Sequence, residues 1–128
     1  MHYATYAFIA LGGALGALGR YFLSTWIYER GEYIFPWGTF VVNMLGCFLL
    51  GLVYVLGVEK LVINPNTRAF LAVGFLGAFT TFSTFSLETL NIIKNGQIKI
   101  ALLNGAGSLL IGLVAVWLGT VAAQLITK

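Results

Sequence analysis

Hydrophobic residues along this 128-residue chain fall into four long runs that charged residues separate. Residues 1–26 contain a single charged residue, Arg20, while residues 33–58, 69–87 and 100–127 contain no charge at all. Each run supplies about 20 residues, which as a helix crosses a hydrocarbon core of about 30 Å. Membrane-spanning strands would instead alternate apolar and polar residues, and these runs do not. The pattern therefore predicts an all-α membrane protein with helices near residues 4–26, 37–58, 69–91 and 100–124.

Composition supports a membrane location and excludes several classes of function. Hydrophobic residues make up 59% of the chain and charged residues only 9%, whereas a soluble domain carries about a quarter charged residues. A single cysteine excludes an intrachain disulfide or a thiolate metal site. One histidine and four scattered acids leave little for acid–base catalysis, and seven dispersed cations form no nucleic-acid-binding patch. We expect no enzyme and no nucleic-acid partner.

The segments between the predicted helices are too short to hold a soluble domain, so residues 1–128 are predicted to form one membrane domain. The turn-forming Asn64-Pro65-Asn66 lies in the middle connection, over residues 59–68. The first run lacks a basic segment before its apolar stretch, which favours a retained helix over a signal peptide. Aromatic residues cluster at one boundary and are typical of an interfacial belt: Trp26, Tyr28, Tyr33 and Trp37.

Positive charge is nearly balanced between the two ends of the predicted bundle. One end holds Lys60, Arg68 and Lys128, and the other holds Arg30, Lys94 and Lys99, with Arg20 added if it extends that way. Orientation normally follows an excess of Lys and Arg on the cytoplasmic side. The balance predicts that both orientations insert, which allows an antiparallel dimer, although a single orientation set by finer details stays open.

Four short helices have little interior of their own, so we expect oligomerisation to enclose any polar path. Small residues at four-residue spacing favour close helix contacts, as at Gly12 and Gly16, and again at Asn104, Ser108 and Gly112. Such spacing is common in helical membrane proteins. It indicates tight packing and carries no information about a substrate.

The third predicted helix carries an unusual concentration of hydroxyl groups. Two glycines, Gly74 and Gly77, precede a Thr80-Thr81 step, and phenylalanines follow at every third position. The hydroxyls are those of Thr80, Thr81, Ser83, Thr84 and Ser86. Glycines before such a step allow a helix break, which membranes tolerate only where protein or a wet cavity surrounds it. The alternative is an unbroken helix whose hydroxyls bond to its own carbonyls.

Three further polar residues lie within the predicted spans. Asn43 is an amide in the second span, Arg20 lies in the first and Glu88 lies near the end of the third. Ionisable groups at such depths are functional candidates, but an Arg20–Glu88 pair or an Arg20 side chain extended to the interface is an equal alternative. Thr39 is expected to cap or begin the second helix, and Cys47 to be a small buried hydrophobe.

Hydrogen-bond donors dominate this set of groups. The Asn43 amide, the hydroxyls, Arg20 and the positive edges of aromatic rings suit a small anion, whereas a cation path would more naturally offer carboxylates. Phenylalanines would form a narrow, weakly polar passage that an ion can leave again. The sequence therefore favours an anion pathway through the third span.

Three segments resemble the Fluc (CrcB) fluoride channel family: residues 74–86 (GFLGAFTTFSTFS), residues 38–46 (GTFVVNMLG) and residues 13–21 (GALGALGRY). The similarity covers the whole chain in length, number of spans and motif order, and the third-span motif is the most specific part. The resemblance implies an antiparallel, dual-topology homodimer in the bacterial inner membrane, which is the plasma membrane. It would export fluoride passively through two pores and hold a sodium ion at the dimer interface.

The resemblance also implies roles for individual residues. Phe82 and Phe85 would line the pore with their ring edges toward fluoride, and Asn43 would donate from its amide nearby. Gly77 and Thr80 would give backbone carbonyls, from both subunits, to the sodium ion. The remaining pathway residues would be Ser83, Thr84 and Glu88 along a polar track, Ser108 as a hydroxyl on the fourth helix, and Arg20 near the aqueous vestibule.

Two other functions compete with this interpretation. Small multidrug-resistance transporters share the length, the four spans and the dual topology, but their mechanism needs a glutamate in the first span, where this chain has Arg20. A non-transporting membrane subunit would explain the packing glycines. It would not explain a donor-rich third span with phenylalanine at every third position.

Overall fold

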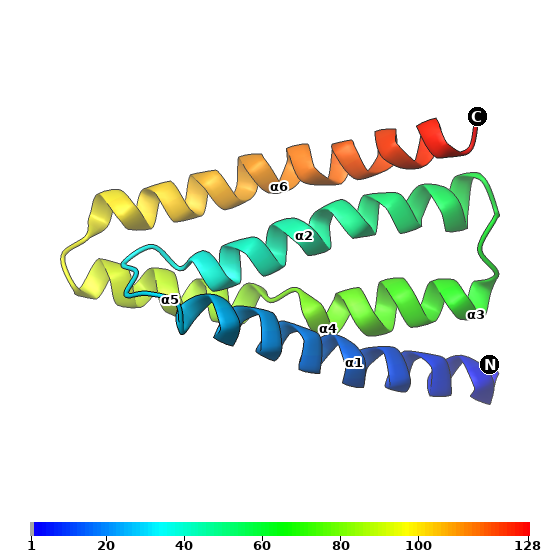
Figure 1. The fold of residues 1–128 in the computed structure, drawn as a ribbon, viewed down its shortest axis with the longest axis horizontal. Helices are drawn as coiled ribbons and strands as arrows, with labels where there is room; N and C mark the ends of the chain where they lie inside the picture. Colours follow the sequence, from blue (N-terminus) through cyan, green and yellow to red (C-terminus); the bar gives the residue numbers. More distant parts are fainter. Residues whose placement is uncertain (1) are drawn as a thin grey trace.

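The computed structural model describes residues 2–128, and within them lie four helical segments long and apolar enough to cross a membrane. The first is α1 (Tyr3–Tyr28), the second is α2 (Trp37–Tyr54) with its π-helical continuation η1 (Val55–Glu59), and the last is α6 (Ile98–Ile126). The segments run alternately up and down, so both chain termini and the connection after η1 lie at one end of the bundle (Figure 1). The prediction of an all-helical protein with four spans is confirmed.

The third span is broken, as the Gly-Thr-Thr pattern predicted. It begins with α3 (Pro65–Arg68), widens into the π-helical η2 (Ala69–Leu76), continues as α4 (Gly77–Phe79) and resumes as α5 (Phe82–Lys94). Between α4 and α5 the backbone of Thr80 is extended, with φ −86° and ψ 154°, and that of Thr81 also, with φ −148° and ψ 119°. The alternative of an unbroken hydroxyl-rich helix is wrong, because two consecutive residues leave helical geometry.

The third span is longer than the predicted residues 69–91, and local capping explains both ends. Asn64 accepts a hydrogen bond from the Thr67 N–H (2.8 Å), and Pro65 occupies the first helical turn, where its missing N–H costs nothing. At the other end Gly96 adopts φ 81°, which lets Gln97 N–H bond to the Ile92 carbonyl at 3.1 Å. The segment Asn64-Pro65-Asn66, which was predicted to form a turn, therefore starts the helix.

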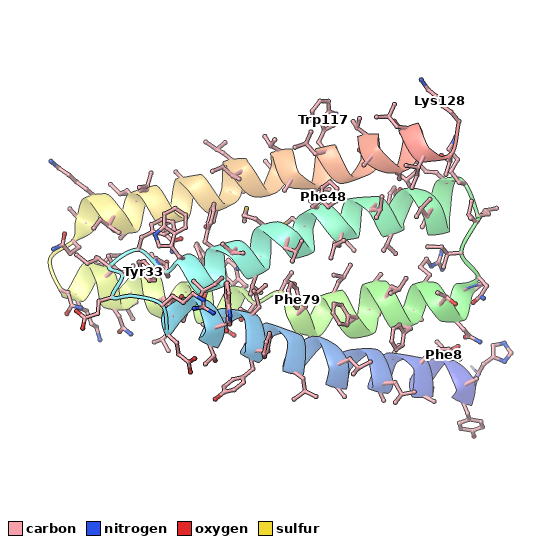
Figure 2. The ribbon with its side chains drawn as sticks, in the orientation of Figure 1. Phe8, Tyr33, Phe48, Phe79, Trp117 and Lys128 are labelled. Atoms are coloured by element: carbon pink, nitrogen blue, oxygen red, sulfur yellow. The ribbon has the colours of Figure 1, made fainter. Side chains whose placement is uncertain are left out.

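Glycines set the closest contacts between helices. A Cβ on Gly51 would meet the Val116 carbonyl of α6, and a Cβ on Gly16 would meet the Phe75 carbonyl of η2. These contacts pair α2 with α6 and α1 with the first half of the third span, the arrangement drawn in Figure 1. The Trp117 side chain points away from the bundle (Figure 2), and large apolar side chains remain exposed along every span. Lipid or another protein chain must cover these surfaces.

We predict that Gly16→Ala destabilises the fold while Gly13→Ala, on the same helix, does not. The new Gly16 methyl group would overlap backbone atoms of Phe75, whereas a Cβ on Gly13 would have its nearest neighbour, the Gly74 carbonyl oxygen, at 3.9 Å. Overpacking costs about 1–3 kcal/mol, and the alanine gains about 1 kcal/mol of helix propensity in both variants. Unfolding free energies measured by SDS titration should separate the two; equal values would contradict the close contact.

Candidate functional site: the broken third span and its cavity

The helix break is held by one side chain from the neighbouring span. The Asn43 amide nitrogen donates to the Thr81 carbonyl (3.0 Å), and the Thr81 N–H donates to the Asn43 amide oxygen (2.8 Å). Asn43 thus pairs with the extended backbone of Thr81 as a neighbouring β-strand would. Asn43 was predicted as a donor to an ion, and one of its two amide hydrogens is instead committed to the backbone. The second amide hydrogen of Asn43 can be donated to a ligand.

The break leaves two backbone carbonyls, those of Gly77 and Thr80, without the N–H donors of a continuous helix. In a continuous helix the Thr81 N–H would bond to the Gly77 carbonyl and the Thr84 N–H to the Thr80 carbonyl. Here the first N–H goes to Asn43, and the second goes to the Thr81 hydroxyl oxygen (3.2 Å). The carbonyls of Gly77 and Thr80, the two residues singled out by resemblance as sodium ligands, are those that lose these helical donors.

Arg20 of α1 also binds at this break. Its Nε donates to the carbonyl of Ala78 at 3.0 Å. Because the end of a helix carries partial negative charge on its carbonyls, a guanidinium here stabilises the end of α4. The sequence left Arg20 either paired with Glu88, extended to the interface or placed in a vestibule. The structure gives it a backbone partner that no sequence pattern signalled.

A cavity of about 630 Å³ opens beside the break, between α2, the third span and α6. Six of the sequence-predicted residues line it: Asn43, Gly77, Thr80, Phe82, Phe85 and Ser108. Every residue in its lining is uncharged. The cavity therefore offers neutral polar groups set in an apolar wall, which is typical of a site that binds a small solute without holding it tightly.

Two aromatic rings and a helix start meet at this cavity. The rings of Phe82 and Phe85 have centroids 5.7 Å apart and planes tilted by 41°. Phe82 begins α5, and Thr81 caps that helix with its side-chain oxygen. The first N–H groups of α5 give this end a partial positive charge. Phe82 is 79% exposed, so a single chain leaves one side of this ring pair open.

Glu88 lies in a separate cluster, near the end of the bundle that holds the α1–α2 connection. Its two carboxylate oxygens accept hydrogen bonds from Tyr28 Oη (2.8 Å) and from the Thr39 hydroxyl. The Tyr28 hydroxyl also accepts from the Thr39 N–H at 3.2 Å. Three spans therefore meet at one carboxylate. The sequence assigned Tyr28 to an interfacial belt and Thr39 to a helix start, and it missed this cluster because the partners lie far apart in sequence.

The other predicted residues take three positions. Ser83 lies exposed on the first turn of α5, within 3.4 Å of the Thr81 hydroxyl, and Thr84 contributes the capped N–H on the same turn. Ser108 donates to the buried amide of Asn104 at 3.2 Å. Cys47 is half-buried and lines the cavity. Thus the cavity, the Glu88 cluster and the first turn of α5 hold the predicted polar residues in distinct groups, and Arg20 lies apart from them at the Ala78 carbonyl.

Comparison with known proteins gives the same assignment over almost the whole chain. Residues 7–120 match the family described as CrcB-like protein, Camphor Resistance (CrcB). A protein of Acidobacterium capsulatum named fluoride-specific ion channel FluC is 48% identical over 119 residues, which cover 93% of this chain and 95% of that protein. A protein of the same name from Magnetococcus marinus is 48% identical over 120 residues, covering 94% of this chain and 98% of its own length.

We predict that Asn43→Leu destabilises the fold by about 2–4 kcal/mol, because it leaves both backbone groups of Thr81 without their partner at membrane depth. Met44→Leu is the matched control, since Met44 lines the same cavity on the same helix and this exchange conserves volume. Unfolding free energies in detergent micelles would be compared. If the two variants unfold alike, the Asn43 pairing does not support the break.

Proposed function

Because the chain belongs to the CrcB-like protein family, we propose that it is a fluoride-selective channel through which fluoride leaves the cell passively. The relatives are named as ion channels and not as enzymes. The observation that carries the proposal is the neutral, donor-bearing cavity beside the start of α5, in a chain nearly half identical to those channels. Fluoride is small and strongly hydrated, so its passage needs hydrogen-bond donors that replace water along the way.

The donors that face this path come from the break. The second amide hydrogen of Asn43, the first N–H groups of α5 and the Thr81 hydroxyl all lie where α4 gives way to α5. The ring edges of Phe82 and Phe85 add the positive part of their quadrupoles. The path continues through Ser83, Thr84 and Ser108 toward Glu88, with Arg20 holding the break in place. Neutral donors strip some hydration and still release the ion.

A sodium ion fits the carbonyls that the break releases. The Gly77 and Thr80 carbonyls have lost the N–H groups that would bond to them in a continuous helix, and the Thr80 hydroxyl gives its hydrogen to the Leu76 carbonyl at 2.9 Å. These groups therefore present lone pairs, which is the ligand chemistry of a hard cation. A bound sodium ion would supply a fixed positive charge at the break, and carbonyls from a second copy would complete its ligand set.

An antiparallel homodimer in the bacterial inner membrane would enclose this path. One chain leaves Phe82 79% exposed and has few fully buried apolar residues. The basic residues divide almost equally between the two ends of the bundle, which removes the usual orienting signal. A single polypeptide inserting both ways would bring two broken spans together, with a pore on each side of their contact. The membrane potential then drives fluoride outward without any coupled reaction.

We predict that the purified protein in liposomes passes fluoride and very little chloride. The cavity offers neutral hydrogen-bond donors, and a larger, softer halide gains less from them than fluoride does. Fluoride and chloride efflux would be followed together with ion-selective electrodes in valinomycin-treated liposomes. Equal fluxes of the two ions, or no flux above protein-free liposomes, would end the proposal.

Two variants connect this flux to the aromatic rings. Phe85→Ile should slow fluoride efflux by up to about tenfold while the oligomeric state stays unchanged, because a ring contact is worth up to about 1.5 kcal/mol. Phe8→Ile is the matched control, since Phe8 lies on α1 toward the N-terminal end (Figure 2) and does not line the cavity. Identical rates for both variants would remove Phe85 from the path.

We also predict that the chain inserts in both orientations. A single cysteine placed in a C-terminal tag, in a Cys47→Ser background, should react with a membrane-impermeant maleimide from each side of the membrane. The two populations should be of similar size, since the flanking charges balance. Adding two lysines to the C-terminal tag should bias the population toward one orientation. Labelling from one side alone in the unbiased protein would refute dual insertion.

A further inference from the structure

A chain of hydrogen bonds behind the cavity joins two of its lining residues. Ser108 Oγ on α6 donates to Asn104 Oδ1 (3.2 Å), and Asn104 Nδ2 donates to Thr89 Oγ1 on α5 (2.9 Å). Thr89 Oγ1 in turn donates to the carbonyl of Phe85 at 2.7 Å. Asn104 is 1% exposed, whereas Ser108 and Phe85 line the cavity. The relay therefore connects the two sides of the cavity through a buried amide.

The Phe85 carbonyl determines the direction of every hydrogen bond in this relay. The Phe85 carbonyl can only accept, so the single Thr89 hydroxyl hydrogen is committed to it. Thr89 must therefore accept from Asn104, which places the amide nitrogen toward Thr89 and the amide oxygen toward Ser108. Because that oxygen can only accept, Ser108 must give it the one hydrogen it has. Ser108 is left with lone pairs for the cavity.

We infer that Asn104 is a positioning residue that sets the polarity of Ser108: it holds the Ser108 hydrogen away from the path, so an anion gains that donor only by displacing Asn104. This inference rests on the proposed fluoride path past Ser108. The Asn104 amide oxygen thus competes with the anion for the Ser108 hydroxyl hydrogen. Passage past Ser108 carries the equilibrium cost of breaking one intramolecular hydrogen bond, a factor of about five.

Asn104→Leu tests this competition directly. Leucine conserves most of the volume and removes the acceptor, while Thr89 keeps its own bond to Phe85, so Ser108 is the one relay donor that loses its partner. Fluoride efflux from liposomes should rise about fivefold. Gln124→Leu is the matched control: it removes the same amide from an exposed position of the same helix, and efflux should stay within twofold of the unmodified protein.

The double variant Asn104→Leu/Ser108→Ala separates positioning from packing. If Asn104 acts through Ser108, this variant is no faster than Ser108→Ala alone. A packing role would change efflux by the same factor with and without Ser108, and that result would overturn the inference, as would Asn104→Leu protein that is slower than or equal to the unmodified protein.

Two further observations keep the test decisive. If Asn104→Leu is not recovered as folded protein, Thr89→Val replaces it. This variant removes the acceptor of Asn104 Nδ2, so the amide can turn its nitrogen toward Ser108 and release the Ser108 hydrogen. Efflux should then rise in the same Ser108-dependent way. Absence of fluoride efflux from the unmodified protein would instead contradict the proposed function. That outcome is distinct from a channel that conducts fluoride but is indifferent to Asn104.

Discussion

The pairing of Asn43 with the backbone of Thr81 is the interaction on which the rest of the site depends. A broken helix exposes backbone N–H and carbonyl groups in a medium that offers no water to satisfy them. Asn43 satisfies one of each on the same residue, through 2.8 and 3.0 Å contacts, while Arg20 occupies the Ala78 carbonyl. With these partners supplied by other helices, the break keeps extended backbone, starts α5 at the cavity and directs two carbonyls away from helical donors.

Much of this arrangement could be predicted from the sequence, because its determinants are local. Uninterrupted apolar runs gave the four spans, and Gly77 followed by Thr80-Thr81 marked the break, where the structure has it. The start of the third span was missed because Asn64 and Pro65 are typical both of a turn and of a helix start. The partners of two predicted residues, Ala78 for Arg20 at the break and Tyr28 for Glu88 in its separate cluster, depend on which helices become neighbours. Helical periodicity carries no such information.

The incomplete interior of one chain and the balanced charge of its two ends belong to the same physical problem. The cavity beside the break is open on one side in a single chain, whose helices already meet closely at glycines such as Gly16 and Gly51. Phe82, at the start of α5, lines this cavity and is exposed. In the proposed antiparallel dimer, the broken span of a second copy would supply the missing wall. Identical chains in opposite orientations would then need nearly equal positive charge at their two ends.

Counting hydroxyl groups proves a poor measure of what a site offers to an ion. The hydroxyls of Thr80 and Ser108 both line the cavity, yet each gives its hydrogen to a protein oxygen and retains lone pairs. The Thr81 hydroxyl accepts from the Thr84 N–H and lies 3.4 Å from the Ser83 hydroxyl, where either oxygen can be the donor. A serine or threonine therefore favours an anion or a cation according to where its single hydrogen goes. Donor-rich and acceptor-rich ends can lie one residue apart, as the proposed fluoride path and the proposed sodium site would both require of one helix break.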